Sequence, residues 1–256
     1  MNLISSLWLG KERPIHFYYL TLWLMVLGFS GCATLSGNGA DSTSNLTDKK
    51  VAIETVNTRI EKSTIVLEEM IQSSDKAIPS SLLRAAEALI VIPDMFKIGF
   101  GIGANLGQGI AMVRQDDRTW SSPVMISMGG GSLGLQIGAK ETDIILVFKN
   151  RQGLENLVTG SMTLSADLGI AAGPVGVATE AGADSQFNSE IYSYSRSKGL
   201  FAGVSLKGQK IEVDESANLS LYGKVVNVAD IFANRVSATS LNVVNNLKNE
   251  LRKLSP

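Results

Sequence analysis

The chain has 256 residues, of which 45% are hydrophobic and 18% are charged, and its formal net charge is −1. These values suit one globular domain with helical additions, and the near-neutral charge supplies no basic field that would attract nucleic acid. The single cysteine excludes an intramolecular disulfide.

The first 31 residues resemble an export signal. Basic residues precede an apolar run at 15–29, and small residues then lead to Cys32. This order is typical of a secretory signal peptide, and a cysteine after "FSG" resembles the lipobox of bacterial lipoproteins. We expect a signal peptide at 1–31 and an acylated, palmitate-bearing Cys32 as lipid anchor. The alternative is an uncleaved anchor with a free cysteine.

Removal of this signal leaves no histidine, because the single one is His16, and it leaves Cys32 acylated. Catalytic triads and His/Cys zinc sites are then excluded, and paired carboxylates such as Asp116–Asp117 fall near turns, where acidic residues are common. We expect no enzyme, no cofactor and no metal. Ala33 after the cysteine favours a lipid-anchored protein of the bacterial envelope, at the periplasmic face of the outer membrane.

Helical patterns follow a small, polar tether at 32–46. Apolar residues recur at three- and four-residue steps over 47–74, which predicts a helix. A second helix begins near Pro79 and has one apolar side. It leads into an apolar run at 89–92 that we expect Pro93 to end. The carboxy-terminal stripe at 241–254 predicts an amphipathic helix that packs in the core or on a partner.

From about residue 99 to 213 the pattern is that of β-structure. Short apolar runs recur every 8–12 residues or so between Gly, Asn, Asp and Pro, which predicts an antiparallel sheet or partly closed barrel. One helix interrupts them, capped by Asn150 and ended by Gly160. Arg114 and Trp120 bracket a turn, where their pairing is structural unless Arg114 faces a ligand. The fold class is therefore α+β, with helices before and after a Gly-rich sheet.

The stretch "GFGIGANLGQG" at 99–109 has two interpretations, a phosphate-binding turn or a strand with one bare face. Its glycines all have odd numbers, whereas apolar side chains occupy even positions. Alternate residues of a strand face opposite sides, and no helix follows as a dinucleotide-binding turn requires. The pattern favours a strand that another element approaches closely, with a hairpin turn at 105–107.

Several separated motifs resemble the SYLF domain family. They are "IPSSLLRAAEALIVIP", "WSSPVMISMGGGSLGLQIGAKETD", "GIAAGPVG", "YSYSRSKGLFAGVSLKG" and "NLSLYG", in this order between residues 78 and 223. The resemblance implies a lipid-binding, actin-regulator-like domain, since fungal and animal members bind phosphoinositides and bacterial members are secreted or lipid-anchored. We expect this domain at 47–236, followed by the carboxy-terminal helix at 237–256.

The segment "YSYSRSK" supplies the candidate headgroup site, because two tyrosines and two cations share one parity. Aromatic rings lie at headgroup depth and cations meet phosphate, whereas the alternative is a solvated strand face with tyrosine as an ordinary β-former. The candidate residues are Tyr192, Tyr194, Arg196, Lys198, Lys207, Lys210 and Arg84.

The sequence therefore predicts a membrane-anchored protein without enzymatic activity. Its domain binds anionic or phosphorylated lipid headgroups, as a phosphatidylinositol-binding module does, and its partners are membrane lipids rather than nucleic acid. The alternative is a structural or protein-interaction module of the envelope, which uses its terminal helices against a protein partner and has no headgroup specificity.

Overall fold

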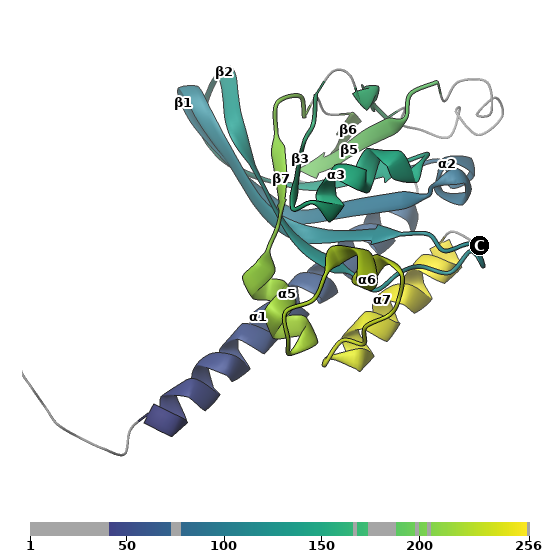
Figure 1. Cartoon of the computed structure of the whole chain (residues 1–256). Helices are drawn as coiled ribbons and strands as arrows, with labels where there is room; N and C mark the ends of the chain where they lie inside the picture. Colours follow the sequence, from purple (N-terminus) through teal and green to yellow (C-terminus); the bar gives the residue numbers. More distant parts are fainter. Residues whose placement is uncertain are drawn as a thin grey trace, which may run out of the picture. The chain divides into compact units, whose positions relative to one another are not determined.

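A computed structural model of the chain (Figure 1) describes residues 41–72, 78–165, 168–173, 188–197, 200–203 and 206–254. The expected signal peptide, Cys32 and Lys198 lie outside these residues. Residues Thr43–Pro256 form one compact unit. Among the described residues, no helix has both the length and the apolar character needed to cross a membrane.

The expected α+β class is confirmed. The elements in chain order are α1 (Asp41–Gln72), α2 (Ser80–Ala85), β1 (Ala88–Val113), β2 (Val124–Phe148), η2 (Arg151–Leu154), α3 (Glu155–Val158), β3 (Ser161–Thr163), β4 (Ile170–Ala172), β5 (Ile191–Ser197), β6 (Leu200–Gly203), β7 (Lys210–Val213), α5 (Glu215–Tyr222), α6 (Val228–Phe232) and α7 (Leu241–Leu254).

The described strands form one seven-stranded sheet in which β2 is central. Along one edge β2 pairs with β1 over nearly its whole length, and along the other it pairs first with β7 and then with β5. These pairings are antiparallel, and β4 joins β5 in parallel. In its second half β2 is hydrogen-bonded on both edges, and the apolar residues there, Ile144 to Phe148, are fully buried.

The predicted succession of short strands is wrong for the first half of the sheet, where β1 has 26 residues and β2 has 25. The expected stop at Pro93 is a bulge instead, and the register shifts between Ile92 and Met95 while Asp94 takes a positive φ of 47°. A bulge leaves proline's missing N–H outside the ladder, so the strand continues through it.

The hairpin turn expected at 105–107 is also wrong, because these residues pair with 128–130 in the middle of the ribbon. The bare glycine face has another purpose. A Cβ on Gly109 would lie 2.0 Å from the carbonyl oxygen of Val91, and one on Gly107 would lie 2.6 Å from Cγ2 of Ile92. Two parts of the same strand therefore pack face to face, and the β1–β2 ribbon folds back on itself.

The helices pack as their apolar stripes predict. Helix α1 begins at Asp41, six residues before the predicted start, and buries Val56, Ile60, Leu67 and Met70, whereas Val51 at the start of the predicted stripe is 56% exposed. The Asn150 side chain caps η2 by accepting from the Gly153 N–H at 3.2 Å, as expected. In α7 the predicted stripe is confirmed by its buried members Val244, Leu247 and Leu251.

The three carboxy-terminal helices close over the β1–β2 turn (Figure 1). The Asn218 carboxamide of α5 bonds with both the N–H and the carbonyl of Met125, each at 2.9 Å. Tyr222 donates its hydroxyl to the Pro123 carbonyl at 2.7 Å. These bonds satisfy backbone groups at the start of β2, and the Asp214 N–H also donates to the Met125 carbonyl at 2.9 Å.

Arg114 has a structural role, and the alternative that it faces a ligand is wrong. The residue is 1% exposed, and its guanidinium donates to the carbonyls of Ala86 and Leu83, each at 2.9 Å. It also lies 4.5 Å from the centre of the Trp120 ring, which confirms the pairing across the turn. The buried cation thus bonds the end of α2 to the β1–β2 turn.

Candidate functional site

The two tyrosines of the predicted site do not lie on an exposed face. Tyr192 is 4% exposed and Tyr194 is 0% exposed. Strand β5 has neighbours on both edges, and a Cβ on Gly173 would lie 2.1 Å from Cζ of Tyr194, so this ring is covered by backbone. The two side chains lie on the same face of the strand, as their spacing predicts, but that face is turned toward the core. These rings therefore cannot reach a lipid surface, and this part of the site prediction is corrected.

The cations of the predicted site are dispersed, and two of them have carboxylate partners. Arg196 bonds with Asp143 at 2.9 Å and with Glu69 of α1, and Lys210 pairs with Glu212 at 2.6 Å. Arg196 is therefore a link between α1 and the sheet.

Arg84 and Lys207 stay exposed. Arg84 lies in the last turn of α2, and Lys207 in the turn before β7. The structure thus does not gather the described candidates into one site, and these two exposed cations keep the headgroup role only as a proposal.

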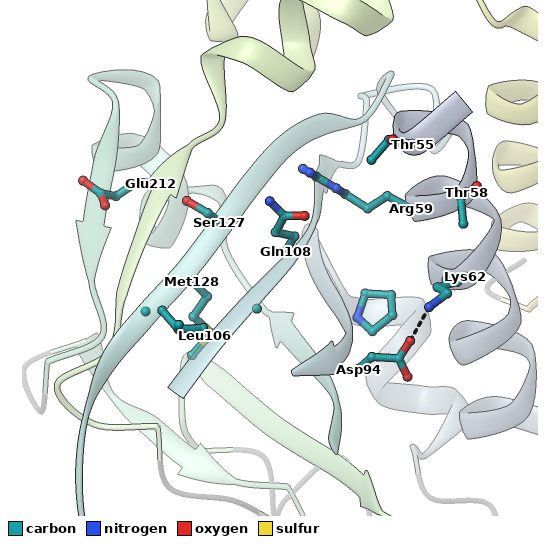
Figure 2. Close-up of a pocket in the computed structure, with 13 residues that line it drawn as sticks. Thr55, Thr58, Arg59, Lys62, Asp94, Leu106, Gln108, Ser127, Met128 and Glu212 are labelled. Carbon is teal, nitrogen blue, oxygen red and sulfur yellow. Dashed lines mark hydrogen bonds and ion pairs between the residues drawn. The ribbon is translucent and has the colours of Figure 1, made fainter. Parts of the chain in front are cut away.

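A groove of about 640 Å³ lies between α1 and the sheet (Figure 2). Sequence reasoning missed it, because its residues come from four elements that are far apart along the chain. Its lining is formed by Thr55, Thr58, Arg59 and Lys62 of α1, Pro93, Asp94, Leu106, Gly107 and Gln108 of β1, Ser127, Met128 and Gly129 of β2, and Glu212 of β7.

Both cations of the groove are neutralised by carboxylates. Arg59, 8% exposed, bonds with Asp214 at 2.9 Å, and Asp214 also caps α5 by accepting from the Ala217 N–H. Lys62 bonds with Asp94 at 2.6 Å, as the dashed line in Figure 2 marks. That hydrogen bond and the Asp94 charge raise the pKa of Lys62. The groove therefore offers hydroxyl and amide groups around apolar side chains rather than a free positive charge.

The exposed apolar side chain at this groove is Leu106, of which 61% is accessible. Figure 2 shows it beside Met128, on the strands that face α1. The groove is poorly suited to a phosphate, since both of its cations are already paired with carboxylates.

The comparisons with known proteins agree with the motifs. Residues 129–254 match the family model Ysc84, described as Las17-binding protein actin regulator. An SH3 domain-containing protein of Schizosaccharomyces pombe is 38% identical over 152 residues, which are 58% of this chain and 35% of that protein. Protein YSC84 of Saccharomyces cerevisiae is 34% identical over 166 residues, 64% of this chain and 35% of the relative.

A human relative, SH3 domain-containing YSC84-like protein 1, is 31% identical over 158 residues, which are 61% of this chain and 46% of that protein. The chain therefore spans between a third and a half of the length of these relatives. The matched residues begin inside β2 and include the sheet strands that follow and the helices α5 to α7. The predicted resemblance to the SYLF family is confirmed over this region.

Proposed function

We propose that this chain, which carries a Ysc84-family domain over residues 129–254, is a binding module that recognises anionic lipid headgroups at a membrane surface. The family is described by binding and actin regulation, and one relative is named LAS seventeen-binding protein 3, whereas neither name gives a catalysed reaction. The lipid part comes from the SYLF resemblance, and anchoring through an acylated Cys32 in the bacterial envelope belongs to the same proposal.

The observation that carries the proposal is the exposed start of α1. Residues 46–51 are all exposed, and Figure 1 shows these turns projecting past the sheet. They combine the apolar side chains of Leu46 and Val51, 69% and 56% exposed, with the ammonium groups of Lys49 and Lys50, which outnumber the one carboxylate of Asp48. Apolar burial together with attraction to anionic lipid is the means by which interfacial helices bind.

Replacing Leu46 with aspartate tests this surface. We expect the variant of residues 33–256 to bind anionic vesicles at least about tenfold more weakly, because it loses apolar burial of about 1.5–3 kcal/mol and adds a repelled charge. Flotation of vesicles with bound protein measures this change, after circular dichroism has shown that the variant is folded.

Val225→Asp is the matched control, because Val225 is 88% exposed and lies outside α1. It adds the same charge to a different surface, so its binding should stay within about twofold of that of the unchanged protein. Equal binding by the Leu46 variant and the control would remove the start of α1 from the membrane surface.

A second candidate function is supported by the groove beside α1. Its neutralised cations and the exposed Leu106 suit a peptide, and a relative found in two strains of Saccharomyces cerevisiae is named LAS seventeen-binding protein 3. In this case the module binds a protein partner, and Leu106→Asp weakens that binding while leaving vesicle binding unchanged.

A further inference from the structure

Two lysines face each other on the folded β1–β2 ribbon. Lys97 of β1 and Lys140 of β2 are direct cross-strand partners, so their Cβ atoms lie about 4.5–5.5 Å apart. Like charges directly opposite each other destabilise a sheet. The pair therefore costs the fold free energy unless a negative charge lies between the two ammonium groups.

The register places this pair on the inner side of the folded ribbon. Met95 packs at the position of Gly107, where a Cβ would lie 3.0 Å from Met95 Cγ, so Met95 faces the other arm of the ribbon. The ladder continues without a shift from Met95 to Lys97, and residues two apart share a face. Phe96, between them, is 39% exposed on the outer side, whereas Lys97 is half-buried and its partner Lys140 is exposed to solvent.

No carboxylate in the part of the chain that the structure describes compensates the pair. Among the described residues, neither ammonium group has an ion pair or hydrogen bond, unlike those of Lys62 and Lys210. Burial is the main cause that lowers the pKa of Lys97, and the charge of Lys140 lowers it further. The neighbouring Glu141 pairs with Phe96 and so belongs to the outer side.

A second unpartnered polar group lies on the inner side of the other arm. Asn105 is two residues from Gly107 and shares its face, and it is 6% exposed. Its side-chain oxygen has no hydrogen-bond partner among the described residues. A buried amide without a partner is costly, and a ligand that bears a hydroxyl group would satisfy it.

We propose that Lys97 and Lys140 bind a phosphate monoester on the inner face of the β1–β2 ribbon. Two ammonium groups at cross-strand spacing can converge on one compact dianion, and lysine binds phosphate as a point charge. If the phosphate belongs to a lipid, this inference rests on the proposed function and specifies the headgroup as a phosphate monoester. A soluble phosphate monoester offers the same chemistry.

The test compares melting temperatures of the full chain in detergent, with inorganic phosphate and with sodium chloride at equal ionic strength. We expect phosphate to raise the melting temperature of the unchanged protein, since a ligand that binds the native state stabilises it. Lys97→Met should melt at the same or a higher temperature without phosphate, because it relieves the repulsion, and should lose the phosphate shift.

Lys224→Met is the control, because it removes the same charge from an exposed position after α5 and should keep the whole shift. Lys97→Arg should also keep most of it. A phosphate shift that survives in Lys97→Met would overturn the inference. So would a loss of stability in that variant without phosphate, because the lysine would then be a structural residue.

Vesicles separate the two sources of phosphate. If the headgroup is the ligand, vesicles with phosphatidic acid, a phosphate monoester, bind more tightly than vesicles with equal charge from phosphatidylglycerol, a diester. Lys97→Met then weakens binding to the first at least about fivefold. A lysine-dependent phosphate shift without vesicle binding would keep the inference and refute the proposed function. Vesicle binding without any phosphate-induced rise in melting temperature would refute the inference and keep the proposed function.

Discussion

Replacing Gly109 with alanine is expected to lower the free energy of unfolding by about 3 kcal/mol or more, at or above the upper end of the usual cost of overpacking. The added Cβ would lie 2.0 Å from the Val91 carbonyl oxygen and 2.9 Å from Cα of Ile92. Both contacts are with backbone, which cannot rotate away as a side chain does. The two arms of the ribbon must separate, and chemical denaturation followed by circular dichroism measures the loss.

Gly129→Ala supplies the matched control in the partner strand. A Cβ there would meet Leu106 Cδ2 at 3.6 Å and the backbone carbonyl oxygen of Asn105 at 3.8 Å, which are ordinary contacts. Because alanine also restricts the unfolded chain, this variant should be as stable as the unchanged protein or slightly more stable. If the Gly109 and Gly129 variants unfold at the same denaturant concentration, the ribbon does not fold back on itself.

The Arg114→Met variant is expected to lose about 3–6 kcal/mol, the contribution of two hydrogen bonds from a charged donor. Methionine keeps most of the side-chain volume but leaves the carbonyls of Leu83 and Ala86 buried without a donor. It also ends the stacking on Trp120. Thermal and denaturant unfolding measure the change, and α2 should become the first part to exchange its amide hydrogens.

Arg118→Met, four residues away, is the comparison. Arg118 pairs with Glu87 at 2.9 Å and also donates to the Arg84 carbonyl, but it is 51% exposed, and exposed ion pairs contribute about 1 kcal/mol or less. Similar losses in the two variants would mean that the Arg114 bonds are no stronger than those of a surface arginine, and its structural role would be wrong.

The features that were predicted correctly are local ones. The Asn150 cap depends on residues three positions apart, and the α7 stripe depends on helical spacing within fourteen residues. The bare glycine face of β1 was also visible in the sequence, because parity alone reveals it. The segment that packs on that face could not be predicted, because it is another part of the same strand, around the bulge at Pro93.

The two tyrosines of the candidate site were predicted to be exposed, but they are buried. Alternation places Tyr192, Tyr194 and Arg196 on one face, but it does not say whether that face is covered. The face is covered, since Tyr192 and Tyr194 are buried and Gly173 packs against the Tyr194 ring. Lys97 and Lys140 come from strands whose register shifts twice, between Ile92 and Met95 and between Gly99 and Gly101. Their spacing in the sequence therefore gives no sign that they are neighbours.

The central claim is that the domain recognises anionic headgroups, and one partition measurement tests it most directly. Residues 33–256 retain every described residue and omit the expected signal peptide and anchor. We expect them to bind anionic vesicles at least about tenfold more tightly than neutral ones at low salt, and to lose this preference as salt is added. Equal partition onto both kinds of vesicle at low salt would contradict the claim and leave the protein-interaction function in its place.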